Sequence, residues 1–164
     1  MTNEIAIRGI DDAARVSKAL ADSGFYKDVK TASQAMVKVM AGVELGITPL
    51  AAMTGIHIVD GKVTLGSGLV ASQIMRSGSY RYRIIESTAK TCKLLFQEKE
   101  GDKWIDLNPV VEFSYEDAKK AGLTGKQNWS KYPDAMLFAR AITKGARLHT
   151  PQIFGGPIYT PEEL

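Results

Sequence analysis

The chain has only one cysteine, Cys92, and only two histidines, His57 and His149, among its 164 residues. A single cysteine excludes an internal disulfide and any cysteine-rich zinc site. Because no disulfide holds the fold together, the composition favours a reducing, cytoplasmic compartment. The two histidines offer little material for acid–base catalysis, since His57 lies in an expected strand and His149 at an expected helix end, where a cation is favoured.

The signatures of several enzyme and membrane classes are also missing. The sequence contains no G-x-S-x-G, H-E-x-x-H, P-loop or G-x-G-x-x-G motif. No stretch approaches 18 consecutive apolar residues, and the N-terminus carries acids where a signal peptide needs basic residues. We therefore expect a protein that is not an enzyme, has no catalytic residues, metal or cofactor, and does not insert into a membrane.

The overall composition is that of a folded protein. Hydrophobic residues make up 45% of the chain and charged residues 24%, and this length predicts a single domain over residues 1–164. There are 21 Lys and Arg against 18 Asp and Glu, which gives a net charge of +3. Such an excess permits a polyanionic partner without requiring one. Whether the protein binds a polyanion therefore depends on where the charges lie.

Periodicity predicts an α+β fold in which helices precede and follow an antiparallel β-meander. Residues 1–30 form an N-terminal helical segment, residues 125–130 a loop and residues 150–164 an extended C-terminal tail. Helices are expected at residues 11–23, 33–45, 49–53, 67–77, 114–121 and 133–148. Strands are expected at residues 56–59, 62–65, 79–87, 91–100 and 108–114, in a sheet of four or five strands.

The long C-terminal helix carries the first candidate binding surface. At about 100° per residue, Arg140, Lys144 and Arg147 form one stripe about 10 Å long, comparable to about three successive phosphates. Most charge runs are solvated surfaces, but this one has no acid among its cations to form the usual i,i+4 pairs. On these residues alone, solvation and phosphate binding both stay open. The opposite, buried side is expected to consist of Ala135, Phe138, Ile142 and Ala146.

The strand over residues 79–87 carries the second candidate surface. A period of two places Arg81 and Arg83 on one face and Tyr80 and Tyr82 on the other. We expect the two arginines to contact phosphates, while the two tyrosines either stack on bases or pack in the core. The same basic surface is expected to include Lys62, beside the hairpin turn, and Arg76, at a helix end.

Two stretches of the sequence resemble the RecT family of phage single-strand annealing recombinases. They are LGITPLAAMTGIHIVDGKVTL with the following RSGSYRYRIIE, and NWSKYPDAMLFARAITKGARLHTPQIFGGPIYTPEEL. The resemblance covers residues 31–164 and implies a β–β–β–α core that binds single-stranded DNA without sequence preference. It further implies annealing of complementary strands through a duplex intermediate without ATP, homo-oligomeric rings or helical filaments, and a location in the cytoplasm of a bacterial host.

The resemblance also implies where the DNA lies. In that family a strand occupies a basic groove between the sheet and the long helix, and Trp129 matches an aromatic residue with a packing role. A longer C-terminal tail recruits a partner exonuclease or a host single-strand-binding protein, whereas residues 160–163 show only the pattern of a helix beginning. The positions that the resemblance assigns to DNA are Arg140, Lys144, Arg147, Arg81, Arg83 and Lys62.

One departure from the family concerns the spacing of the cations. Family members often have two adjacent basic residues near the helix end, whereas Gly145 and Ala146 separate Lys144 from Arg147 here. One other function class also fits the residues, and a third fits less well. A protein-interaction module without catalytic activity, such as a phage inhibitor of a host factor, would set the basic surfaces against an acidic protein. A nuclease would need a carboxylate cluster that the sequence does not display.

Overall fold

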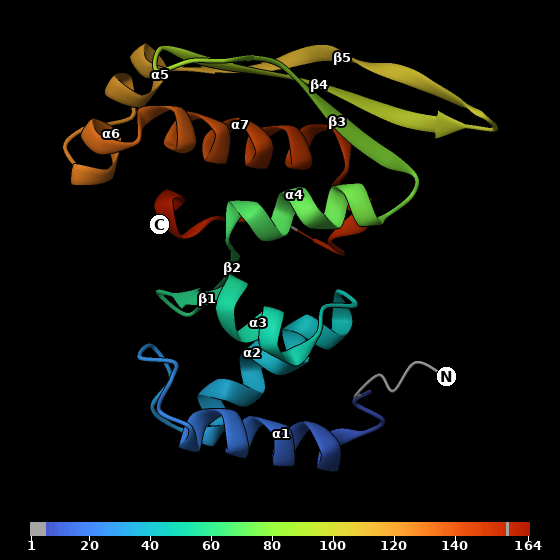
Figure 1. The fold of residues 1–164 in the computed structure, drawn as a ribbon, viewed down its shortest axis with the longest axis vertical. Coiled ribbons are helices and arrows are strands. Elements are labelled where there is room, and N and C mark those ends of the chain that lie inside the picture. Colours follow the sequence, from blue (N-terminus) through green and yellow to red (C-terminus); the bar gives the residue numbers. More distant parts are fainter. Residues whose placement is uncertain (1–5, 157) are drawn as a thin grey trace. The chain divides into compact units, whose positions relative to one another are not determined.

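The computed structural model describes residues 6–156 and 158–164 and has an α+β fold (Figure 1). The chain divides into two compact units. The helical unit consists of Met1–Gly66 with Pro161–Leu164, and the sheet unit consists of Ser67–Thr160. Each unit has its own antiparallel sheet, so the expectation of one four- or five-stranded meander is wrong.

The helical unit packs short helices beside a β-hairpin. Its hairpin turn is the one that the Asp-Gly pair predicts, because Asp60 and Gly61 both have positive φ, 49° and 74°, as a type I′ turn requires. Its elements are α1 (Ile10–Asp22), α2 (Ala32–Glu44), α3 (Pro49–Gly55), β1 (Ile56–Val59), β2 (Lys62–Leu65) and the 3-10 turn η2 (Pro161–Glu163). Its core consists of Ala13, Val29, Ala35, Val39 and Met53.

One core position of the helical unit is a lysine. The Lys38 side chain is only 2% exposed, and its Nζ donates to Asp28 Oδ2 at 2.8 Å and to the Met53 carbonyl at 2.6 Å. These two hydrogen bonds replace those to water that the ammonium loses when it is buried. Lys38 lies among the apolar positions of α2. The periodicity of the helix alone did not indicate that Lys38 would be buried.

The sheet unit is a three-stranded meander covered on one face by a long helix. The strand order is β3-β4-β5, α7 packs against β4 and β5, and α4 packs against α7. Its elements are α4 (Ser67–Arg76), β3 (Tyr80–Ser87), β4 (Thr91–Glu100), β5 (Lys103–Ser114), α5 (Tyr115–Lys120), α6 (Gln127–Lys131), α7 (Pro133–His149) and the 3-10 turn η1 (Pro151–Ile153). The two 3-10 turns also interrupt the expected extended tail.

The expected loop over residues 125–130 is wrong, because α6 begins at Gln127. Trp129, in this helix, is only 1% exposed, and its ring meets the Tyr115 ring edge-on at 6.2 Å between centroids. Trp129 therefore packs in the core, as the resemblance implies for this position. Burial of this large ring gives a five-residue helix a stability that its sequence alone does not provide.

The core of the sheet unit lies between α7 and the facing side of the sheet. Phe96 of β4 is fully buried there, and Gly145 of α7 lies so close that a Cβ would overlap the Phe96 ring. The expected buried side of α7 is correct for Ile142 and Ala146, but Ala135 is exposed. The α7 residues that are buried are Leu137, Ala139, Ala141, Ile142, Thr143, Gly145 and Ala146.

The helix α5 begins with a capping box. The Ser114 hydroxyl accepts from the Asp117 backbone N–H at 3.1 Å, and Asp117 Oδ2 accepts from the Ser114 N–H at 2.9 Å and from its hydroxyl at 2.7 Å. These bonds, led by the one from the Ser114 N–H, lower the pKa of the Asp117 carboxyl. Ser114 and Asp117 thus form the capping box that their spacing of three residues before a helix predicts.

The capping box predicts a pH-dependent effect of Asp117→Asn. A depressed native pKa stabilises the folded state above the unfolded pKa of about 3.9, and this contribution disappears as the pH falls through the lower native value. At pH 7 we expect the variant to lose about 1 kcal/mol, a typical capping contribution. Urea unfolding of both proteins should give a difference that is constant from about pH 7 to 5 and shrinks below about pH 4. A difference that persists in acid would contradict this explanation.

In the described ranges, no single helix is long and apolar enough to cross a membrane. The helices α2 and α3 meet the criteria of length and composition only as a pair, which is bent by 111°.

Candidate nucleic-acid interface

The positive charge of the chain is concentrated in the sheet unit. Residues 67–160 contain 14 Lys and Arg against 9 Asp and Glu, a net charge of +5. The remaining residues contain 7 Lys and Arg against 9 Asp and Glu, a net charge of −2. The small surplus of the whole chain thus hides a clear asymmetry between its two units, and a polyanion would be attracted to the sheet unit.

The three cations of α7, which we term the α7 cation set, are Arg140, Lys144 and Arg147. Lys144 is exposed, and its Nζ donates to the Glu112 carbonyl of β5 at 3.0 Å. Arg147 is exposed, and its Nη1 donates to the Ile158 carbonyl at 3.0 Å. These carbonyls hold the two cations at defined positions along α7.

Arg140 differs from the other two members of the set. Its guanidinium carbon lies 5.3 Å from the centroid of the Phe113 ring, and its Nη1 is buried. A cation over an aromatic face is favourable, and this contact ties α7 to the end of β5. The expectation that all three cations form one exposed stripe is therefore correct for Lys144 and Arg147, while Arg140 is half-buried in the contact between helix and sheet.

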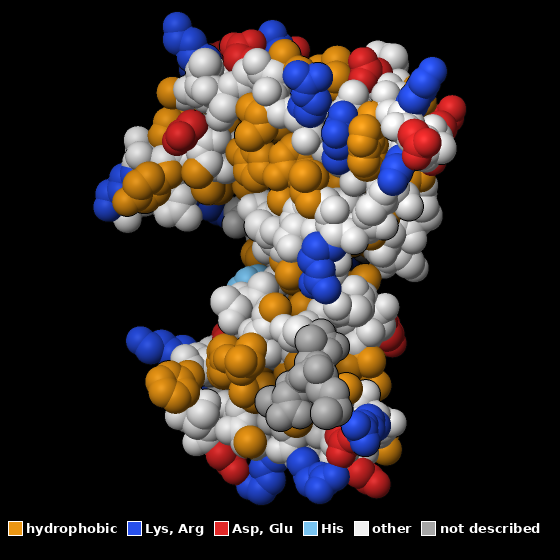
Figure 2. All heavy atoms as spheres, turned by 45° about the vertical axis from the view of Figure 1, so that its right-hand side comes forward, with side chains coloured by type: hydrophobic (Ala, Val, Ile, Leu, Met, Phe, Trp, Pro, Cys, Tyr) orange, Lys and Arg blue, Asp and Glu red, His pale blue; other side chains and the backbone are white. Residues whose placement is uncertain are grey.

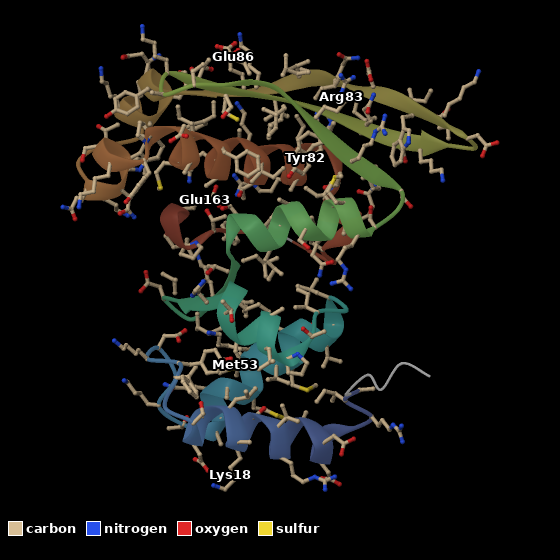
Figure 3. The ribbon with its side chains drawn as sticks, viewed as in Figure 1. Lys18, Met53, Tyr82, Arg83, Glu86 and Glu163 are labelled. Carbon is tan, nitrogen blue, oxygen red and sulfur yellow. The ribbon has the colours of Figure 1, made fainter. Side chains whose placement is uncertain are left out.

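The two arginines of β3 lie on the other side of the sheet. The ring of Tyr82 lies 6.0 Å from that of Phe138 in α7, so Tyr82 faces the helix. Arg81 and Arg83 alternate with Tyr82 along the strand and therefore point to the face turned away from α7, which we term the outer face. In Figure 3, Tyr82 lies between β3 and α7, whereas Glu86 lies on the outer side.

This arrangement corrects the expected groove. A single trough between the sheet and the long helix would need both basic sets on the same side of the sheet, but α7 and the outer face are on opposite sides. On the face of the sheet unit that Figure 2 shows, Lys and Arg side chains lie around a hydrophobic patch, together with acidic side chains. The sequence periods correctly separated Arg81 and Arg83 from Tyr82 on β3, but they did not predict which face of the sheet α7 covers.

Of the two alternatives for Tyr80 and Tyr82, the structure favours packing in the core for Tyr80. Tyr80 is buried, and its hydroxyl donates to Glu98 Oε1 at 2.9 Å and accepts from Gln152 Nε2. Burial is the main cause that raises the pKa of the Tyr80 hydroxyl. Tyr82 is partly exposed and lies against the Phe96 and Phe138 rings, at 6.3 and 6.0 Å between centroids, so its ring packs at the edge of the core.

The last two expected residues lie in different units. Arg76 is exposed at the end of α4 in the sheet unit, and Lys62 is exposed at the start of β2 in the helical unit. Lys62 therefore belongs to the unit with a net negative charge. The structure gives no grounds for adding it to the surfaces of the sheet unit.

A functional candidate that the sequence reading missed is Trp104. This residue belongs to β5, which begins at Lys103, five residues earlier than expected. On the outer face, the guanidinium carbon of Arg81 lies 4.3 Å from the centroid of the Trp104 ring. Extending the alternation of β5 toward the turn at Gly101 would have placed Trp104 in the strand.

Nothing in the described ranges forms a group of three or more His, Cys, Asp and Glu side chains able to hold a metal ion. Cys92 is buried in β4, and burial raises its pKa to about 11, so it remains a thiol at neutral pH. The His149 ring nitrogen Nε2 lies 2.9 Å from the Pro109 carbonyl, which is a contact between α7 and β5. Comparisons of this chain with protein-family models, curated proteins and solved structures give no match.

Proposed function

We propose that this protein binds single-stranded DNA without sequence preference and anneals complementary strands without ATP. The observation that carries the proposal is the concentration of positive charge in the sheet unit, with a net +5 against −2 in the rest of the chain. The resemblance of residues 31–164 to RecT-type annealing proteins supports the same function. A charge-based mechanism also accounts for binding without preference, because every nucleotide carries the same phosphate.

The α7 cation set is the proposed phosphate contact. A lysine ammonium has three donors, so the bond of Lys144 to a carbonyl still leaves donors for a phosphate. The bonds of Lys144 to Glu112 and of Arg147 to Ile158 hold both cations at defined places along the helix. A strand held there by its phosphates would keep its base edges accessible to a second strand.

Annealing also requires a track longer than one helix. The stripe of α7 is only long enough for about three phosphates, so one protomer alone would hold too few nucleotides for two strands to pair stably. We propose that copies of the chain assemble on the DNA, as rings or filaments, and continue the track from one protomer to the next. A complementary strand could then pair in register over many bases.

The proposal is tested by binding and annealing assays on the full chain. Labelled oligonucleotides of unrelated sequence should bind with similar affinity, and complementary pairs should anneal faster in the presence of the protein. If about four cations per protomer contact phosphates, the logarithm of the affinity should fall with that of the salt concentration with a slope of about −2.8. Fluorescence anisotropy at several salt concentrations gives this slope directly.

The possible results separate the function classes. Binding without faster annealing would indicate a protein that only coats single strands, and the annealing part of the proposal would be wrong. Absence of binding at low salt would contradict the proposal altogether. It would favour the protein-interaction module, for which the basic surfaces meet an acidic protein.

A further inference from the structure

The outer face of the sheet carries an aromatic ring covered by a positioned arginine. Arg81 of β3 reaches across β4 to Trp104 of β5, with its guanidinium carbon 4.3 Å from the ring centroid. Its Nε donates to Gln97 Oε1 at 2.7 Å, and the Gln97 amide donates to Asp106 Oδ1 at 2.5 Å. Gln97 is only 6% exposed, so this chain of bonds holds the guanidinium in place over the Trp104 ring.

Further cations surround this pair. Arg83 is exposed two residues along β3, at about 7 Å from Arg81 on the same face. Lys99 is exposed on β4, directly opposite Trp104 in the strand register. The Asp106 carboxylate accepts a bond from Gln97, and farther along the face Lys93 pairs with Glu86 at 3.0 Å. The positive charge of the outer face therefore collects around Trp104.

We propose that the Arg81–Trp104 pair is a stacking site for an unpaired base of single-stranded DNA, with Arg83 and Lys99 binding the adjacent phosphates. This inference rests on the proposed function and adds a second contact, on the side of the sheet away from α7. A guanidinium and an indole ring are both flat groups on which a base can stack, and every base has a flat face to offer them. Such a site needs no particular sequence.

The chemistry of the site favours a nucleic acid strand over an acidic protein. Carboxylates would satisfy the cations, but they would leave the planar surface of the Arg81–Trp104 pair unused. A single strand supplies both parts, a phosphate for Arg83 or Lys99 and a base for the stack. A duplex supplies phosphates only, because its bases are stacked on one another. The site therefore distinguishes single-stranded from double-stranded DNA.

Tryptophan emission reports on this site directly. The chain has only two tryptophans, and Trp129 is 1% exposed in the core, so a bound strand can reach only Trp104. We expect unlabelled oligo-dT to quench the emission of the wild-type protein and a blunt-ended DNA duplex without a loop to quench it far less. In Trp104→Phe the remaining emission comes from Trp129, and oligo-dT should leave it unchanged.

Affinities of variants complete the test. Base stacking on an aromatic side chain is worth about 1–3 kcal/mol, so Trp104→Ala should weaken oligo-dT binding about 5- to 150-fold. Arg81→Lys keeps the charge but loses the planar surface and should weaken binding as well. The matched control is Tyr132→Ala, which removes another exposed aromatic ring of the sheet unit and should leave affinity unchanged.

The outcomes distinguish this inference from the proposed function. If oligo-dT binds by anisotropy but wild-type emission does not change, or the duplex quenches equally, the stacking site is refuted while DNA binding stands. If Trp104→Ala binds oligo-dT with the affinity of the wild-type protein, the stacking site is likewise refuted. If oligo-dT does not bind the wild-type protein at low salt, the proposed function itself fails. The emission of the wild-type protein needs no substitution, so the test does not depend on how a variant folds.

Discussion

Replacing Lys144 and Arg147 together with glutamate is expected to abolish binding of single-stranded DNA at physiological salt. The double substitution changes the charge of α7 by four units at the proposed phosphate contact. Each lost contact removes part of the counterion release that drives binding, and each new carboxylate repels a phosphate. We expect the affinity to fall at least about 100-fold, and any residual binding to have a shallower salt slope. Fluorescence anisotropy at two salt concentrations measures both effects.

Lys144 and Arg147 are the right pair because substitution should leave the fold intact. Both side chains are exposed, so their substitution leaves no cavity in the core of the sheet unit. Arg140 is unsuitable, since a glutamate there would bring a carboxylate against Phe113 in the contact between α7 and β5. Circular dichroism should show the helical content of the wild-type protein in the double variant.

The helical unit offers a matched control for this experiment. Arg15 and Lys18 of α1 are also three residues apart and well exposed, with side chains 77% and 70% accessible (Figure 3 labels Lys18). Reversing both changes the net charge of the protein by the same amount, but in the unit that is already negative. If both double variants lose affinity equally, overall charge and not the α7 cation set determines binding. Wild-type affinity of the α7 variant would refute the assignment.

Replacing Gly145 with alanine is expected to destabilise the sheet unit, although alanine is the better helix former. In an open helix interior, alanine gains about 1 kcal/mol over glycine. At position 145 the added Cβ would overlap the ring of Phe96, which is fully buried and lies 5.4 Å from the His149 ring between centroids. Overpacking of this kind costs about 1–3 kcal/mol or more, because the ring has no free space to enter.

The sign of the effect is the critical result. We expect a lower free energy of unfolding in urea, and a Tm reduced by roughly 4–8 °C for each kcal/mol lost in a unit of this size. Gly68→Ala is the control, since Gly68 lies in α4 with no atom within 4 Å of an added Cβ, and alanine should be neutral or stabilising there. In the Gly145→Ala background, Phe96→Leu should cost less than it does alone. A stabilised Gly145→Ala protein would show that α7 and β4 are farther apart than described.

Local signals in the sequence predicted local structure well. The Asp60-Gly61 turn, the capping of α5 by Ser114 and the helix over residues 133–148 depend on residues within a few positions of one another, and all three are confirmed. The α+β class follows from the same patterns. The loop expected over residues 125–130 failed because α6 depends on burying Trp129 against Tyr115, which is a contact with another helix.

The candidate site was predicted less completely than the fold. Strand alternation correctly grouped Arg81 with Arg83, and helix periodicity correctly placed Lys144 and Arg147 on one exposed side. The prediction that these two groups form one surface was wrong. Whether they do depends on which face of the sheet α7 covers. The Arg81–Trp104 contact was missed because it joins two strands across a third, beyond the reach of any pattern within one strand.

By itself, the sequence determined where most helices and strands begin and end and which side chains share a face of each, because backbone dihedrals and capping are set by near neighbours. The tertiary structure decided which of those faces is buried and which charges lie together. It placed Lys38 in a core, Arg140 against Phe113, and the two arginines of β3 on the side away from α7. The physical reason is that burial and charge proximity depend on packing between elements distant in sequence, where Phe96, Phe138 and Gly145 fill one interior.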